Sequence, residues 1–85
     1  MELRKTAVFE RDIKKLDGTM RHRLKKAIVK IASNPWLRKP LRHLPGLFSE
    51  RLENYRLVYR VTGDELLLLC FKNREDVYEH VRDLP

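Results

Sequence analysis

The chain has 85 residues, a formal net charge of +7 and one cysteine, and these properties exclude several classes of protein. Its length predicts one small domain over residues 1–85. The lone Cys70 cannot form an internal disulfide, and the longest apolar run, Leu66 to Phe71, is too short to span a bilayer. We therefore expect a cytoplasmic protein, and no motif for a cofactor or a metal ion is visible.

The positive charge is concentrated in the first half of the chain. Residues 1–45 hold 13 Lys and Arg against 4 Asp and Glu, whereas residues 46–85 hold 6 against 8. A basic excess of this size on a small body attracts polyanions, so nucleic acid is the first candidate partner and an acidic protein the second. A membrane surface is not the expected partner, because the short basic helices need their apolar faces for the core.

The first half is expected to form a strand followed by two helices. Residues 3–8 are a candidate strand, and a short helix then places apolar side chains on one face, at Phe9, Ile13 and Leu16. An Asp-Gly pair at 17–18 ends this helix, and Thr19 is a natural N-cap for the next one. The second helix runs to the Asn-Pro pair at 34–35 and carries one apolar stripe, formed by Met20, Leu24, Ala27, Ile28 and Ile31. The two helices should form a hairpin that packs on a sheet.

The rest of the second helix is strongly basic. No acidic residue lies between Thr19 and Ile31, and the basic positions include Arg21, Arg23, Lys25, Lys26 and Lys30. Such a run is usually a solvated helix face, but the absence of any acid favours a surface that binds a polyanion.

The second half is expected to supply most of the sheet. Residues 36–46 are irregular, and three apolar side chains should pin them to the core, those of Trp36, Leu41 and Leu44. Strands follow at 47–53 and 55–62, joined by a turn at 53–54 that uses an asparagine tolerant of left-handed backbone angles.

A further strand and a helix complete an α+β fold. The apolar run at 65–71 predicts a central strand that is covered on both faces. Asn73 can cap a last helix, whose apolar edge is formed by Val77, Val81 and Leu84. The predicted fold is therefore an N-terminal strand and a helical hairpin packed on a mainly antiparallel sheet of about four strands, with a short C-terminal helix.

Arginine side chains interrupt the predicted hairpin strands. In the second of them, apolar residues at 55, 57, 59 and 61 alternate with Arg56, Val58 and Arg60. Because successive side chains point to opposite faces, one face is apolar and the other carries guanidinium groups. With Arg51 on the preceding strand, these groups could form a rigid cationic surface suited to phosphate, although a merely solvated outer face remains open.

The residues on and beyond the last strands could support RNA cleavage by the ribose 2′-hydroxyl. This reaction needs a base, an acid for the leaving oxygen, and positive charge where the phosphorane oxygens become more negative. Arginine and lysine supply the charge without a metal, and Tyr78 or His80 could supply the base. Composition and spacing alone do not distinguish cleaving RNA from holding it.

Three segments between Pro40 and Tyr78 resemble the RelE toxins of bacterial and archaeal toxin–antitoxin systems, within the wider RelE/ParE superfamily. They are PLRHLPGLFSER at 40–51, YRLVYRV at 55–61 and KNREDVY at 72–78. The resemblance implies a RelE-like fold, similar to small microbial ribonucleases, with helices packed on one face of the sheet.

The resemblance also implies roles for single residues. Arg51 matches a basic residue on the first hairpin strand, and Arg56 matches the arginine that supports the transition-state phosphate. Lys72 or Arg74 matches the basic residue that protonates or stabilises the leaving group, and Tyr78 matches the tyrosine that orients or activates the attacking 2′-hydroxyl. The basic helices would contact ribosomal RNA through Arg21, Arg23, Lys25, Lys26 and Lys30, and Arg60 of the second hairpin strand is a further RNA-binding candidate.

Three positions depart from the pattern of these toxins. Ser49 stands where some relatives carry a second lysine, and Lys39 falls near the catalytic glutamate of one subgroup. His80 lies two residues beyond Tyr78 and has no clear equivalent, so the general base remains open between them.

The implied activity is that of a toxin that enters the ribosomal A site and cleaves the mRNA there without a metal ion, arresting translation. A RelB-type antitoxin would neutralise it through an acidic segment, and operator DNA would be met only through that antitoxin. Two alternatives stay open: a ParE-type poison of DNA gyrase, and a non-catalytic RNA-binding regulatory module.

Overall fold

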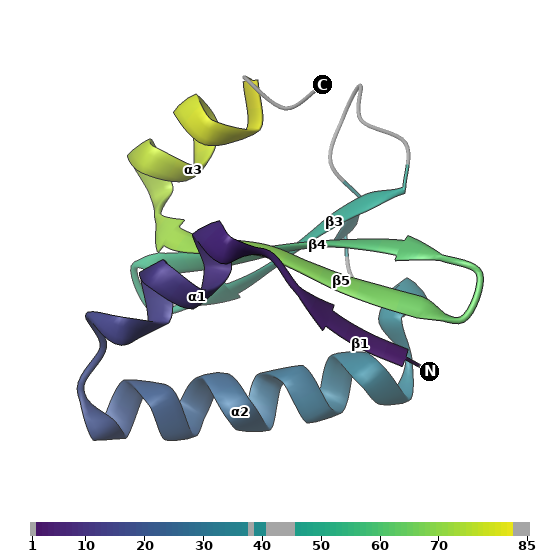
Figure 1. Ribbon diagram of the computed structural model, residues 1–85, viewed down its shortest axis with the longest axis horizontal. Coiled ribbons are helices and arrows are strands. Elements are labelled where there is room, and N and C mark those ends of the chain that lie inside the picture. Colours follow the sequence, from purple (N-terminus) through teal and green to yellow (C-terminus); the bar gives the residue numbers. More distant parts are fainter. Residues whose placement is uncertain (1, 38, 41–45, 83–85) are drawn as a thin grey trace.

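The computed structural model describes residues 2–37, 39–40 and 46–82. In chain order its elements are β1 (Glu2–Lys5), α1 (Ala7–Lys14), α2 (Gly18–Ser33), a single 3-10 turn (Pro35–Leu37), β2 (Lys39–Pro40), β3 (Leu47–Leu52), β4 (Tyr55–Thr62), β5 (Glu65–Asn73) and α3 (Arg74–Arg82) (Figure 1). Among these elements, no helix is both long and apolar enough to cross a membrane.

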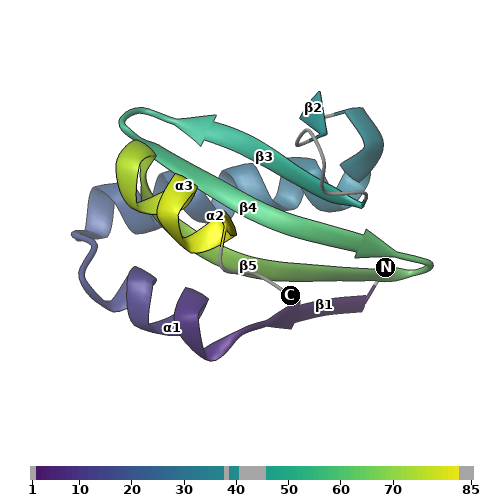
Figure 2. The ribbon, with the colours of Figure 1, turned by 90° about the horizontal axis from the view of Figure 1, so that it is seen from above.

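The strands form one mixed sheet in the order β1-β5-β4-β3-β2. Strands β2 to β5 pair antiparallel, and β1 pairs parallel to β5 at the sheet edge. Helix α2 lies across one face of this sheet and α3 lies over the other, with α1 beside the β1 edge (Figures 1 and 2). The predicted α+β fold is confirmed, but the helices are divided between two faces rather than gathered on one.

Strand β1 ends at Lys5, before the end of the strand predicted at 3–8, because Thr6 begins the next helix. The side-chain Oγ1 of Thr6 accepts a hydrogen bond from the backbone N–H of Phe9 at 3.0 Å, which caps α1, and donates to the carbonyl of Leu69 at 2.6 Å. One hydroxyl thus starts the helix and ties it to β5.

Replacing Thr6 by alanine should lower the free energy of unfolding by about 1–2 kcal/mol, because both bonds of the hydroxyl are lost. Thr6→Ser is the matched control, since it keeps the hydroxyl and should retain most of the stability. Urea denaturation of the three proteins measures the difference. Equal losses in both variants would show that the methyl group, not the hydroxyl, carries the effect.

The cap of α2 and the hairpin turn each use a residue close to the predicted one. Asp17, rather than Thr19, caps α2, and its Oδ1 accepts from the N–H of Met20 at 2.8 Å. In the turn between β3 and β4, Glu53 rather than Asn54 has the left-handed backbone, with φ of 55°. A two-residue hairpin turn with positive φ at its first position normally takes glycine there, so Glu53 is strained.

A β-bulge in β5 determines which apolar residues of this strand lie on each face of the sheet. Val58 pairs with Cys70 but the next residue, Tyr59, pairs with Leu68, which leaves Leu69 as the extra residue. Because an extra residue reverses the alternation, Leu66 and Leu68 lie on the same face as Phe71. The prediction that this strand is covered on both faces is confirmed, since Leu69 and Cys70 are buried in the second cluster.

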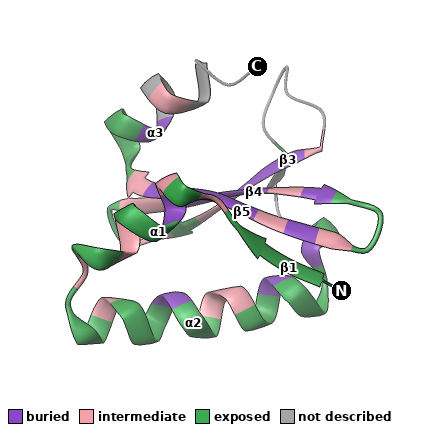
Figure 3. Cartoon of the chain, in the orientation of Figure 1, coloured by how far each residue is buried: buried purple, intermediate pink, exposed green. Residues whose placement is uncertain are grey.

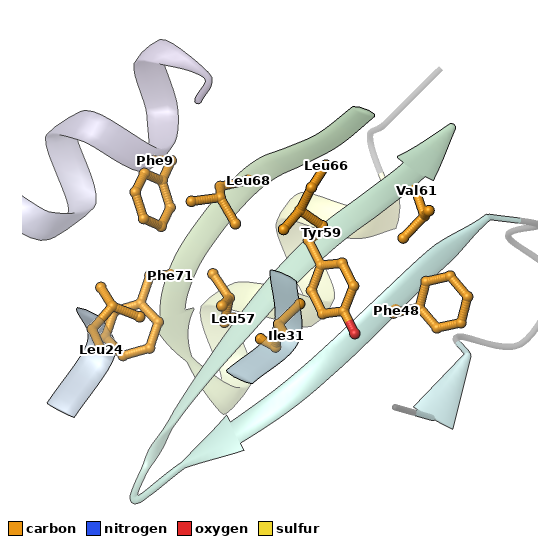
Figure 4. Close-up of a cluster of buried hydrophobic side chains, with 10 residues drawn as sticks. All are labelled: Phe9, Leu24, Ile31, Phe48, Leu57, Tyr59, Val61, Leu66, Leu68 and Phe71. Carbon is orange, nitrogen blue, oxygen red and sulfur yellow. The ribbon is translucent and has the colours of Figure 1, made fainter. Parts of the chain in front are cut away.

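Two apolar clusters hold the layers together. The larger lies between the sheet and the helices α1 and α2, and its buried members are drawn in Figure 4. The smaller lies on the opposite face and includes Val77 of α3 and Leu47 of β3. Figure 3 shows the buried residues in the central strands, whereas β1 and most of α2 are exposed.

The prediction that Trp36 anchors this segment to the core is wrong. Trp36 is 62% exposed, and its ring makes an edge-on contact with Phe48, at 5.6 Å between ring centroids. The neighbouring Pro35 is buried instead, and its carbonyl accepts a hydrogen bond from the hydroxyl of Tyr59 at 3.0 Å. Four other predicted anchors lie outside the described residues or side chains: Leu41, Leu44, Val81 and Leu84.

Candidate functional site

Strand register brings three predicted site residues into one row across the sheet. Arg51 of β3 pairs with Arg56 of β4, and Arg56 pairs with Lys72 of β5. Directly paired residues of antiparallel strands share a face, with Cβ atoms roughly 4.5–5.5 Å apart. The row lies on the α3 side of the sheet, since Val58, two residues along from Arg56, packs in the smaller cluster. Three neighbouring cations repel one another, and such an arrangement favours a bound anion.

A groove of about 400 Å³ lies at the end of this row. It is formed where the β3–β4 turn meets the start of α3, two segments that Figure 2 shows at the same end of the sheet. Its lining residues are Arg51, Glu53, Asn54, Tyr55, Arg56, Asn73, Arg74 and Glu75. Arg74 is placed there because the amide oxygen of Asn73 caps α3, accepting from the N–H of Asp76 at 2.9 Å as predicted.

The turn residue Glu53 organises the edge of the groove. Its backbone carbonyl accepts a long hydrogen bond from Nε of Arg51 at 3.4 Å, and its carboxylate is paired with the guanidinium of Arg23 on α2. The negative charge of Glu53 is therefore directed to α2 and away from the guanidinium group of Arg56 in the groove.

Lys72 occupies the row but turns toward α1. Its Nζ lies 2.8 Å from Oδ1 of Asp12, whose Oδ2 accepts from the backbone N–H of Phe71 at 3.0 Å. Lys72 lines a second hollow of about 480 Å³, formed with Val8, Arg11, Asp12 and Lys14 of α1 and with its C-cap, Lys15. The structure thus separates the predicted catalytic cations into an arginine groove and a neighbouring lysine site.

The predicted general bases lie on α3. Tyr78 belongs to this helix, but its side chain lies outside the described residues. His80, two residues further along the same helix, is partly buried. The choice between the two therefore stays a prediction.

Cys70 lies beneath this region and is unsuited to act as a nucleophile. It is fully buried, and burial raises the pKa of its thiol to about 11, helped by the nearby negative charge of Asp12. Because the thiolate is the reactive form, the group stays inert at neutral pH.

Two of the five predicted RNA-binding cations of α2 have structural partners. The guanidinium of Arg21 donates to the carbonyls of Ile13 and Lys14 at 3.3 and 3.1 Å, which closes the last turn of α1. Arg23 holds Glu53 of the hairpin turn. Neither role was visible in the sequence, because each partner lies on another element.

The three lysines of α2 are exposed to solvent, at positions 25, 26 and 30. Lys26 and Lys30 border a hollow of about 300 Å³ that runs from α2 to Arg51. Arg60 is separate from both grooves: it pairs with Leu47 and Leu67, and it lies four residues along β4 from Arg56, roughly 13 Å away.

Asp12 was missed by sequence reasoning, although a signal was present. It follows Phe9 by three residues and precedes Ile13, so it falls on the apolar side of α1. A carboxylate in that position needs a polar partner when it is buried, and its side chain is only 9% exposed.

Most of the chain matches one known sequence family. Residues 3–78 match the sequence model of a family described as the ParE toxin of type II toxin–antitoxin systems, parDE. No curated protein gives a significant match.

Several solved toxin structures are similar to this chain. A mutant Escherichia coli RelE toxin in the free state has a TM-score of 0.79 and 28% identity, covering 98% of this chain and 97% of that one. The intact E. coli RelBE toxin–antitoxin complex gives 0.76 and 27% identity, covering 85% and 94%. The RelBE2 complex of Mycobacterium tuberculosis gives 0.58 and 32% identity, covering 86% and 96%.

Proposed function

The chain belongs to the ParE toxin family of type II toxin–antitoxin systems, within the RelE/ParE superfamily, and from this premise we propose that it is a RelE-type endoribonuclease. It would cleave mRNA in the ribosomal A site, in the cytoplasm, and so arrest translation.

The row of Arg51, Arg56 and Lys72, continued by Arg74 in the adjoining groove, carries the proposal. In the reaction the 2′-oxygen gives its proton to a base as it bonds to phosphorus. The bond from phosphorus to the 5′-oxygen then breaks, and that oxygen takes up a proton. Negative charge grows on the phosphorane oxygens, and fixed guanidinium groups stabilise it without a metal ion. Arg56 is the central cation of the row and the best placed for this role.

The leaving-group and base roles are assigned to Lys72 of the row and to residues of α3. Lys72 or Arg74 would stabilise the leaving 5′-oxygen, and Tyr78 or His80 would accept the proton of the 2′-hydroxyl. Tyr78 has a reference pKa of about 10, so it would need neighbouring cations to act as a base at neutral pH.

The exposed lysines of α2 would hold the toxin on ribosomal RNA. Changing Lys26 and Lys30 together to glutamine should weaken ribosome binding and reduce the slope of log K against log salt by about 1 for each phosphate that is no longer neutralised. Sedimentation with ribosomes at several salt concentrations measures this slope. An unchanged slope would indicate that these lysines only keep the protein in solution.

A RelB-type antitoxin is the proposed regulatory partner, and the complex would reach operator DNA through the antitoxin. The similar structures include toxins described in complex with RelB. An apolar cleft of about 670 Å³ between β1, α1 and α2 supports such a partner, because basic residues outnumber Glu10 along its lining: Lys5, Lys14, Arg21 and Lys25. An acidic amphipathic segment would match both the apolar lining and these basic residues.

The proposal is tested by inducing the protein without its antitoxin and mapping the ends of a translated message. We expect cuts within codons that leave 5′-hydroxyl ends. A matched message without a start codon should stay intact in the same cells. Intact translated message would overturn the nuclease assignment.

A ParE-type gyrase poison is the second candidate, because the matching family model carries that name. It predicts DNA damage with intact mRNA. The same induction experiment separates the two, since DNA breaks and message ends can be measured in one culture. A non-catalytic RNA-binding module would produce neither result.

A further inference from the structure

We propose that Asp12 is a positioning residue for Lys72: it holds the ammonium group at the outer end of the cation row, where the leaving oxygen of the RNA would be. This inference rests on the proposed endoribonuclease function and adds to it a residue of α1 that the resemblance to RelE toxins does not assign.

The carboxylate of Asp12 is itself held in place. Its Oδ2 accepts from the backbone N–H of Phe71 at 3.0 Å, so the group cannot turn freely. Its other oxygen, Oδ1, lies 2.8 Å from Nζ of Lys72. The two contacts orient the carboxylate and, through it, a flexible four-carbon side chain that would otherwise sample many rotamers.

Asp12 takes its place because β1 is too short to pair with all of β5. The ladder between them ends at Lys5 and Leu68, and Thr6 satisfies the carbonyls of Leu68 and Leu69. Beyond the bulge, α1 replaces β1 at this edge, and Asp12 satisfies the next backbone donor. A neutral acceptor could also accept the hydrogen bond from the N–H of Phe71. We therefore attribute the negative charge of Asp12 to its pairing with Lys72.

The pair leaves Lys72 able to act on a phosphate. An ammonium has three donors, and Asp12 uses one of them. Lys72 is 25% exposed, and the hollow that it lines also holds Arg11, Lys14 and Lys15 beside the carboxylate of Asp12. The local charge therefore remains positive with Asp12 ionised, and RNA phosphate can approach.

The position of Lys72 also distinguishes its role from that of the arginines. Arg51 and Arg56 border the arginine groove, whereas Lys72 is drawn to α1 at the other end of the row. We infer that the arginines bind the oxygens that stay on phosphorus, and that Asp12 keeps Lys72 for the 5′-oxygen as its bond to phosphorus breaks.

The test is Asp12→Asn, which keeps an acceptor for the N–H of Phe71 and removes only the charge. Single-turnover cleavage is measured on ribosomes programmed with one message, over a range of toxin concentrations. We expect the maximal rate to fall by about 10- to 100-fold, with the half-saturating toxin concentration unchanged. Asp17→Asn is the matched control, since it removes one negative charge from a helix cap that asparagine fills equally well.

A double-mutant cycle separates positioning from a general structural role. In protein that already carries Lys72→Ala, adding Asp12→Asn should cause no further loss of rate, because Asp12 acts through Lys72. Equal losses in both backgrounds, or an unchanged rate in Asp12→Asn alone, would overturn the inference while leaving the proposed function in place. Absence of cleavage by the unaltered protein would instead overturn the proposed function, and this inference with it.

Discussion

Arg56→Ala should lower the rate of ribosome-dependent mRNA cleavage by about 10²–10³-fold, the usual cost of removing one preorganised donor from a developing oxyanion. Arg56 has Arg51 on one side and Lys72 on the other. A phosphate bound by Arg56 would therefore lie close to both of the other cations. The variant should fold normally, because removing the middle charge relieves repulsion within the row. Rates on programmed ribosomes, with thermal unfolding measured in parallel, check both statements.

Two further variants make the Arg56 result specific. Arg56→Lys keeps the charge but loses the two-pronged geometry, so its rate should fall between those of the parent and Arg56→Ala. Arg4→Ala removes an exposed arginine from β1, whose ion pairs are with Glu2 and Glu65, and should cleave at the parental rate. Full growth arrest by Arg56→Ala in cells would remove this residue from the mechanism.

Phe71→Ala should lower the free energy of unfolding by about 3–5 kcal/mol, the range for aromatic residues deleted from a core. Phe71 is 2% exposed, and its ring stacks on that of Tyr55 at 4.9 Å between centroids. Domains of this kind have total stabilities of roughly 5–15 kcal/mol, so the loss removes a large part of the total. The substitution keeps the backbone N–H that orients Asp12, so a consequence for function would be indirect, through displacement of β5.

Urea denaturation at equilibrium measures the effect of Phe71→Ala. Leu3→Ala is the control, because Leu3 is 44% exposed on the edge strand and its truncation should change stability by less than about 0.5 kcal/mol. Similar losses in the two variants would mean that the larger cluster does not dominate the stability of the fold.

The secondary structure could be predicted well because its signals are local. Helical spacing at Phe9 and Ile13, alternation along β4 and the cap at Asn73 each depend on residues a few positions apart. The differences between prediction and structure are local as well: Asp17 takes the place expected for Thr19, and Glu53 that expected for Asn54. The turn also depends on a distant partner, because the carboxylate of Glu53 is paired with Arg23 of α2.

The sequence by itself determined that the chain is basic, that one strand and two helices precede a run of strands and a last helix, and that arginines lie within its strands. Each of these is a property of composition or of consecutive residues. Only the tertiary structure decided that Arg51, Arg56 and Lys72 share one row, because pairing register depends on turns and on the bulge at Leu69. The tertiary structure alone also showed that Lys72 pairs with Asp12, 60 positions away in the chain. A carboxylate and an ammonium so far apart in sequence meet because α1 packs against the edge of β5, and no pattern of neighbouring residues specifies that packing.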